Sequence, residues 1–172
     1  MRPPRGGANG FHPFGQSWGG YDTLIAQLPR DVRGTLEDCN RRGDYESEEF
    51  EKAAAVFYAR HICRLDPRPE EVLCAFKNLK EDPAAYLTLQ GPSEFVILGS
   101  FKNWEIGQEA RKIEAETLIL NGRYDEATDL CMEPWFSTIP KVKWVTLENS
   151  SHMGRWKERE RYMEVVGSFL MS

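Results

Sequence analysis

Apolar residues recur at three- and four-residue spacing through the first half of the chain, a pattern that predicts helices. The apolar positions are Leu24, Ile25, Leu28, Val32 and Leu36 in the first series, Phe50, Ala53, Ala54, Phe57 and Ile62 in the second, and Val72, Leu73, Phe76 and Leu79 in the third. Ser47 lies in the N-cap position of the second series, and Pro69 opens the third, where helices favour proline. We therefore expect three helices before the first clear strand.

The second half of the chain has a different pattern. Residues 91–104 contain two glycine breaks and predict an extended or hairpin-like loop. Thr117–Gly122 is an apolar run closed by glycine, typical of a buried parallel strand, and Val142–Leu147 predicts a second such strand. Residues 158–170 predict an amphipathic helix packed on the sheet. The apolar face of that helix consists of Tyr162, Met163, Val166, Phe169 and Leu170. The whole pattern indicates the α/β class.

Charge and composition exclude several classes of protein. The chain of 172 residues has 22 Lys and Arg against 27 Asp and Glu, a formal net charge of −5, so we expect no nucleic-acid partner. No apolar run approaches the roughly 20 residues of a bilayer span, and none follows the basic N-terminus, so we expect a cytoplasmic protein without membrane contact. The four cysteines lack C-x-x-C spacing and only three histidines are present, so we expect no metal, no disulfide framework and no cofactor.

A nucleophilic constellation follows the order of the predicted strands. Residues 15–19 match G-x-S-x-G, in which the glycines leave room for a sharp turn around Ser17. The motif alone is equally consistent with a plain glycine-rich loop. Asp125 follows the first predicted strand and His152 follows the second, which reproduces the order Ser, Asp, His of the α/β-hydrolases. In this interpretation Ser17 attacks a carbonyl, His152 accepts its proton, and Asp125 orients the imidazole.

Each of these assignments has a competing structural explanation. Asp125 is alternatively a turn aspartate, and His152 an exposed loop histidine. Asp129 is a weaker candidate for the acid. His12 and His61 are poor candidates for the base, because the first lies in an irregular leader and the second within a predicted helix.

Several segments together resemble one family. They are residues 15–20 (GQSWGG), 27–32 (QLPRDV), 91–95 (GPSEF), 118–126 (LILNGRYDE) and 150–153 (SSHM). In this order they resemble the proline iminopeptidases, α/β-hydrolase-fold aminopeptidases of the serine peptidase family S33. The resemblance implies release of N-terminal proline from short peptides or amino-acid amides, without a metal or other cofactor. It implies that the Trp18 amide is one oxyanion-hole donor and that Glu94 and Glu126 bind the α-amino group of the substrate.

The resemblance also defines the expected organisation. We expect an α/β-hydrolase fold that is truncated and has a helical lid inserted after the nucleophile elbow. Residues 1–20 are the irregular leader and elbow, residues 21–114 the mainly helical lid, and residues 115–172 the C-terminal part of the core. The first strands of the family sheet, the second oxyanion-hole loop and about 30 residues after the elbow have no counterpart here. Residues 10–14 contain Pro13, so the strand before Ser17 is weak or confined to an edge.

Two alternatives to the aminopeptidase remain open from the sequence. In the first alternative, the chain is a shortened, catalytically inactive remnant that binds a peptide or associates with itself through an exposed sheet edge. Alternatively it is an esterase, which keeps the triad but has no use for paired glutamates. Glu94→Gln and Glu126→Gln separate the aminopeptidase from the esterase, because both substitutions spare ester cleavage and abolish aminopeptidase cleavage if the amine-binding role is correct.

Overall fold

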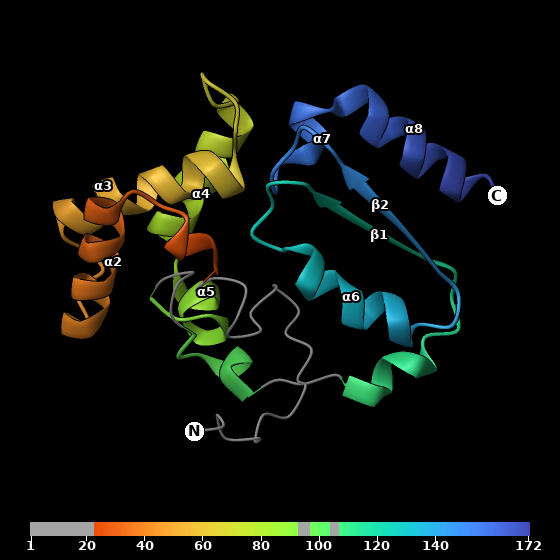
Figure 1. The fold of residues 1–172 in the computed structure, drawn as a ribbon, viewed down its shortest axis with the longest axis horizontal. Helices are drawn as coiled ribbons and strands as arrows, with labels where there is room; N and C mark the ends of the chain where they lie inside the picture. Colours follow the sequence, from red (N-terminus) through yellow and green to blue (C-terminus); the bar gives the residue numbers. More distant parts are fainter. Residues whose placement is uncertain (1–22, 93–96, 104–106) are drawn as a thin grey trace.

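The structure is a computed structural model that describes residues 23–92, 97–103 and 107–172. The predicted leader and elbow, the weak strand at residues 10–14, and Glu94 lie outside these residues. Figure 1 shows two parts of the fold: a group of helices formed by the first half of the chain, and a small sheet with its own helices formed by the second half.

The three predicted helices are confirmed, with local differences. The elements of the helical group are α2 (Arg30–Arg42), α3 (Glu48–Phe57), the π-helical turn η1 (Tyr58–Ile62), α4 (Glu70–Glu81) and α5 (Ala84–Leu89). Pro29 interrupts the first apolar series, so α2 starts after it. Gly43 ends α2 with a φ of 65°, a left-handed conformation that glycine adopts without strain. Ser47 caps α3 as predicted, because its hydroxyl accepts a hydrogen bond from Phe50 N at 3.3 Å.

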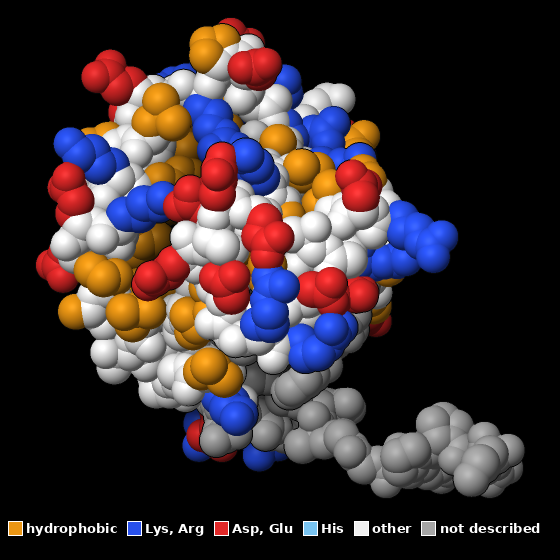
Figure 2. Space-filling view, turned by 90° about the vertical axis from the view of Figure 1, so that its left-hand side faces the viewer, with side chains coloured by type: hydrophobic (Ala, Val, Ile, Leu, Met, Phe, Trp, Pro, Cys, Tyr) orange, Lys and Arg blue, Asp and Glu red, His pale blue; other side chains and the backbone are white. Residues whose placement is uncertain are grey.

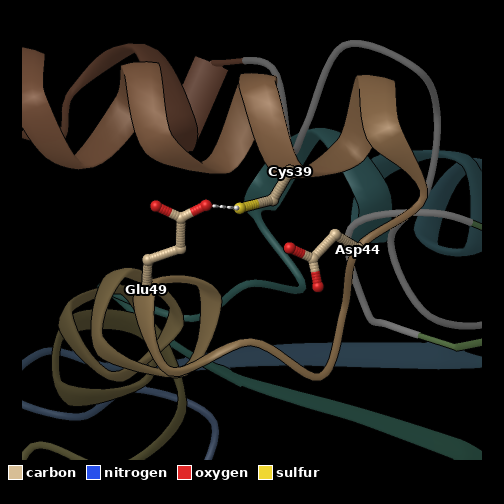
Figure 3. A group of neighbouring side chains, drawn as sticks. All are labelled: Cys39, Asp44 and Glu49. Carbon is tan, nitrogen blue, oxygen red and sulfur yellow. Dashed lines mark hydrogen bonds between the residues drawn. The ribbon is translucent and has the colours of Figure 1, made fainter.

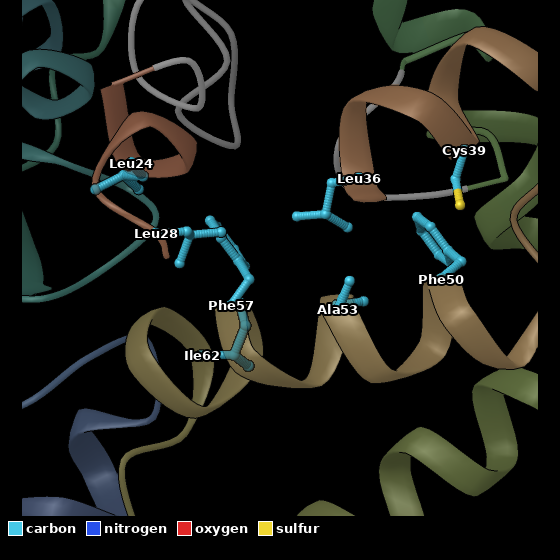
Figure 4. Close-up of a cluster of buried hydrophobic side chains, with 9 residues drawn as sticks. Leu24, Leu28, Leu36, Cys39, Phe50, Ala53, Phe57 and Ile62 are labelled. Carbon is cyan, nitrogen blue, oxygen red and sulfur yellow. The ribbon is translucent and has the colours of Figure 1, made fainter. Parts of the chain in front are cut away.

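The apolar core of the helical group lies between α2 and α3 (Figure 4). Phe57 and Cys39 are fully buried there, and Leu36 and Ala53 lie between them. Burying a side chain of the size of phenylalanine contributes about 1.5–3 kcal/mol, so this cluster is a principal source of stability for the group. The same cluster contains Leu24 and Leu28 from the segment before α2, as their helical spacing predicts.

The second half of the chain forms a β-α-β unit. Strands β1 (Thr117–Gly122) and β2 (Val142–Leu147) pair in parallel, with Thr117 opposite Val142 and Gly122 opposite Leu147. Helix α6 (Asp129–Thr138) connects them, and the short α7 (Gly154–Lys157) and α8 (Arg159–Leu170) follow. Parallel strands need such a crossover, and it brings the carboxyl ends of both strands to one edge.

The two long helices of this unit cover opposite faces of the sheet (Figure 1). Trp144 contacts Phe136 of α6, with ring centroids 5.6 Å apart. The ammonium nitrogen of its neighbour Lys143 lies over the ring of Phe169 in α8, 5.7 Å from the ring centroid. Successive residues of a strand point to opposite faces, so these two contacts place α6 and α8 on different sides.

Three sequence predictions for this half need correction, and one element was not predicted. That element is helix α6, which contains Pro134. Within the predicted loop at 91–104, Ser100–Asn103 forms a 3-10 helix, η2; a second, η3, is Gly107–Lys112. Met163 and Leu170 of α8 are exposed and do not pack on the sheet. The strands are half-buried along most of their length, because each has one paired neighbour in the described part of the chain.

Charged residues of both signs alternate over the outer face of the helical group. Figure 2 shows Lys and Arg side chains interleaved with Asp and Glu, with apolar side chains between them. Neighbouring pairs such as Lys80 with Glu51, at 2.7 Å, account for part of this pattern. Among the described residues, no helix combines the length and the apolar character that crossing a bilayer requires.

Candidate active site

Asp125 lies in the turn that follows β1 and is 5% exposed. Its carboxylate accepts hydrogen bonds from two backbone amides: Gly122 N to Oδ2 at 3.1 Å and Ala127 N to Oδ1 at 2.9 Å. These are the local bonds that aspartate favours in turns. Gly122 also permits close approach of the next loop, because a side chain there would lie 2.4 Å from the carbonyl oxygen of Ser150. The loop thus holds a buried carboxylate in a fixed orientation.

His152 lies in the loop after β2. Ser150 and Ser151, which precede it, are both buried. The Ser150 hydroxyl donates to Glu158 Oε2 at 2.5 Å, and the Ser151 hydroxyl donates to the carbonyl oxygen of Ile62 at 2.9 Å. The side chain of His152 is 43% exposed, so a fixed loop presents a ring that is accessible at the carboxyl edge of the sheet.

The two loops bring Asp125 and His152 together. His152 Nδ1 lies 3.0 Å from Asp125 Oδ1, within hydrogen-bond distance. A carboxylate only accepts, so Nδ1 carries the proton and Nε2 is the nitrogen left to accept one. This is the arrangement of an acid and a general base in which the acid fixes the tautomer of the imidazole.

The charge state of His152 follows from its neighbours. The hydrogen bond to Asp125 and the negative charges of Asp125 and Glu126 raise the pKa of His152 from 6.5 to about 9, against the opposing effects of burial and Arg155. Because this folded-state pKa lies above the unfolded value, the pair stabilises the fold fully below pH 6.5 and loses that contribution as the pH rises through about 9.

The same pKa predicts how nucleophile activation depends on pH. An imidazolium cannot accept a proton, so the rate of Ser17 labelling by an uncharged fluorophosphonate is expected to rise with pH, with a midpoint near 9. The measurement is the labelling rate constant between about pH 6 and pH 10, with circular dichroism at each pH as the control for folding. A midpoint near the ordinary histidine value would contradict the ion pair described here.

Glu126 lies beside this pair and is 9% exposed. Its Oε1 lies 4.0 Å from His152 Nδ1, farther than the 3.0 Å of Asp125. Glu126 is therefore placed to contribute negative charge next to the base. The family resemblance predicts that Glu126 binds the amino group of the substrate. Its position next to the base is compatible with that role.

A pocket of about 250 Å³ opens at this edge of the sheet. Asp125 and His152 line it together with Leu120, Leu147 and Met153. Pockets for drug-sized ligands are typically about 300–1,000 Å³, so this one accommodates a small group. A larger hollow of about 530 Å³ between α3, α4 and α5 contains none of the candidate site residues.

Some of the predicted site residues lie within the described part of the chain and others lie outside it. Asp125, His152 and Glu126 lie together at the carboxyl ends of the two strands. Ser17, Trp18 and Glu94 lie outside the described residues, and their roles stay predictions.

Sequence reasoning missed one residue that organises these loops. Asn121, at the end of β1, is 3% exposed. Its amide nitrogen donates to Asp129 Oδ1 at 2.9 Å and to the carbonyl oxygen of Ala127 at 3.2 Å. Its amide oxygen accepts from Trp144 Nε1 at 2.9 Å and from Thr146 Oγ1 at 3.2 Å. A polar residue inside an apolar strand was the available signal, because a buried amide needs partners.

One cluster of potential metal ligands lies away from this site. Cys39, Asp44 and Glu49 approach one another between α2 and α3 (Figure 3). The guanidinium of Arg42 already lies among them: its Nη2 donates to Glu49, lies 3.5 Å from Cys39 Sγ, and is 3.6 Å from Asp44. The guanidinium already pairs with these carboxylates, so the geometry gives no support for a metal site.

Comparisons with known proteins are consistent with the sequence resemblance. No protein-family model matches the chain. A proline iminopeptidase of Saccharolobus solfataricus is 34% identical over 147 residues, 86% of this chain and 47% of the relative. A proline iminopeptidase of Heyndrickxia coagulans is 36% identical over 154 residues, 86% of this chain and 51% of the relative. The chain thus spans about half the length of the curated relatives it matches.

Solved structures give the fold. The crystal structure of VinJ matches with a TM-score of 0.87 and 34% identity, over 94% of this chain and 54% of that one. The crystal structure of proline iminopeptidase from Mycobacterium smegmatis matches with a TM-score of 0.81 and 30% identity, over 88% of this chain and 51% of that one. The predicted resemblance and the predicted α/β-hydrolase fold class are therefore confirmed for the matched half.

Proposed function

We propose that this chain, a relative of the proline iminopeptidases over about half their length, is a serine aminopeptidase that releases an N-terminal residue, preferentially proline, from short peptides. The observation that supports this most directly is the hydrogen bond between buried Asp125 and accessible His152 at the carboxyl ends of adjacent parallel strands. Active sites of α/β folds lie at this edge.

In the proposed reaction, the Ser17 hydroxyl attacks the carbonyl carbon of the first peptide bond while His152 Nε2 accepts its proton. The Trp18 amide stabilises the resulting oxyanion. His152 then gives the proton to the leaving amine, and an ester between Ser17 and the N-terminal residue remains. Water attacks this ester while His152 accepts its proton, and His152 then gives that proton to the departing Ser17 oxygen, which frees the amino acid and restores Ser17. Asp125 keeps the tautomer and stabilises the transient imidazolium.

Selection of a free N-terminus is assigned to carboxylates. Glu126 lies 4.0 Å from the base and is largely buried, so a substrate ammonium held there would be close to the reacting carbonyl. Glu94 is proposed as the second carboxylate. An internal peptide bond offers no ammonium and so cannot form this charge-assisted contact, which would favour substrates with a free N-terminus. The helical group over residues 21–114 is proposed to act as the lid.

The experiment compares a prolyl arylamide with its N-acetyl counterpart on the purified chain. The proposal predicts release of the arylamine from the free substrate and at least about 100-fold less from the acetylated one. Equal cleavage of both would indicate a general hydrolase. A folded chain that cleaves neither would contradict the proposal and favour the inactive remnant that the sequence left open.

A further inference from the structure

The helical group touches the site through the π-helical turn η1, which ends the second predicted helix. Residues 58–62 leave the α-helical spacing at this point, and Cys63 N closes the turn by donating to the carbonyl oxygen of Tyr58 at 2.9 Å. Such turns are rare and frequently occur at functional sites. Here the turn redirects the chain so that both His61 and Ile62 face the two loops of the site.

The ring of His61 contacts the Asp125 loop. Its Nδ1 lies 2.9 Å from the carbonyl oxygen of Tyr124. A carbonyl oxygen cannot donate, so Nδ1 carries the proton and donates it. The Tyr124 carbonyl belongs to the peptide that enters Asp125, so the ring fixes the peptide plane from which the catalytic acid projects.

The backbone of the same turn contacts the His152 loop. The carbonyl oxygen of His61 accepts the amide of His152 at 3.1 Å, and that of Ile62 accepts the amide of Met153 at 3.0 Å. Ser151 also donates to Ile62, as described above. One residue, His61, therefore bonds both to the backbone of His152 and to the carbonyl of Tyr124, the residue before Asp125.

A second feature of His61, its buried Nε2 without a hydrogen-bond partner among the described residues, argues against a role in packing alone. The residue is 6% exposed. The ring packs on Phe57, with ring centroids 4.8 Å apart. An apolar ring would fill this space without leaving an unsatisfied nitrogen. Retaining histidine here is explained if its Nδ1–H is needed.

We propose that His61 is a positioning residue that orients the Asp125–His152 pair through its Nδ1–H bond to Tyr124. The catalytic meaning of this role rests on the proposed function, whereas the orientation of the pair does not. The sequence made His61 a poor candidate for the base, and its ring nitrogen Nδ1 faces a backbone carbonyl, which fits a positioning role.

The charged groups around His61 keep it in the required form. Burial lowers the pKa of His61, as do the nearby charges of Arg60 and Arg64, while the bond to Tyr124 and the charge of Asp125 act in the opposite direction. The balance favours the neutral ring. His61 is therefore expected to keep one tautomer, with the proton on Nδ1, across the pH range in which His152 titrates.

The wild-type chain tests this directly. With three histidines in the sequence, ¹⁵N-histidine labelling gives three ring spin systems, assigned with His12→Gln and His152→Gln. The expected spectrum has one ring that stays neutral with the proton on Nδ1 throughout the titration, and this ring is His61. A ring of His61 with the proton on Nε2, or one that becomes an imidazolium near the ordinary histidine pKa, would overturn the proposal.

A pair of variants then separates positioning from packing. His61→Phe keeps the ring and removes the donor, whereas His61→Asn places an amide N–H near the position of Nδ1. We expect His61→Phe to lower the pKa of His152 by about one unit and, at a pH well above 9 where the His152 ring is neutral in each protein, to slow fluorophosphonate labelling about tenfold, with His61→Asn close to wild type in both. An unchanged His152 pKa in folded His61→Phe, or an equal shift in both variants, would overturn the proposal.

Two further outcomes are distinguishable. If the wild-type chain is never labelled, the proposed function fails, but the pKa of His152 still reports on His61. If His61→Phe does not fold, the tautomer in the wild type and the His152 pKa in His61→Asn decide: the proposal requires the Nδ1 proton in the first and a pKa near the wild-type value in the second.

Discussion

Replacing Asp125 with asparagine is expected to slow nucleophile activation by about 10⁴-fold, the scale seen when the acid of such a triad loses its charge. Asp125 uses both oxygens: Oδ2 accepts Gly122 N, and Oδ1 accepts Ala127 N and His152 Nδ1. An asparagine has one accepting oxygen, so its NH₂ must face a donor at one of these positions. The change also removes the first cause of the raised pKa of His152.

The measurement for Asp125→Asn is the fluorophosphonate labelling rate at a pH well above 9, where His152 of the wild type is mostly neutral. Asp129→Asn is the matched control, because Asp129 was the competing candidate for the acid and its carboxylate bonds to Asn121 and Arg123 instead. The control is expected to lose less than about tenfold. Equal losses in the two variants would show that Asp125 has no special role.

Glu126→Gln is expected to have the second-largest effect, a loss of about 100-fold in the cleavage of free prolyl arylamides with little loss of labelling. Hydrogen bonds to charged groups contribute about 1.5–3 kcal/mol, which sets this scale for losing the carboxylate that binds an ammonium. The negative charge of Glu126 raises the pKa of His152, so its removal lowers that pKa. Labelling near neutral pH is therefore expected to be as fast as in the wild type or faster.

The measurement for Glu126→Gln compares kcat/KM for the arylamide with the labelling rate in the same preparation. Glu133→Gln is the matched control, because Glu133 is an exposed acid of α6. A parallel fall of both activities would mean that Glu126 supports the fold of the loop. No fall in either would remove the amine-binding role and favour the esterase interpretation.

The sequence predicted the part of the site that depends on strand order. Asp125 and His152 each follow a parallel strand, and the carboxyl ends of paired parallel strands meet, so their proximity follows from β1 and β2 being neighbours. The chain order of Ser17, Asp125 and His152 matches that of the α/β-hydrolase triad, and this order predicted the reaction chemistry. Ser17 lies outside the described residues, so its place beside His152 stays a prediction.

The contacts that the sequence did not predict are those made between distant segments. His61 is separated from Tyr124 by 63 positions, and nothing in the helical pattern of residues 47–62 shows that the last turn is π-helical. Helix α6 was missed for a local reason. Pro134 lies inside it, and proline disfavours a helix interior because it lacks an amide proton. Periodicity reports which face of an element is apolar, and it does not report which loop a polar side chain reaches.

The half-buried strands show a further limit. The apolar run of β1 predicts a strand covered on all sides, yet Leu118 and Ile119 are half-buried. The burial of a strand depends on how many neighbours the sheet supplies, which one segment of sequence does not specify. The described residues supply one neighbour to each strand.

The most direct test of the account is the stoichiometry of fluorophosphonate labelling, measured by the intact mass of the folded 172-residue chain beside Ser17→Ala. The account predicts one phosphonyl group per wild-type chain, located on Ser17 by peptide mapping, and none on Ser17→Ala. Folded wild-type protein that remains unlabelled, or equal labelling of the two chains, would contradict it, because Ser17 would then not be activated by the Asp125–His152 pair.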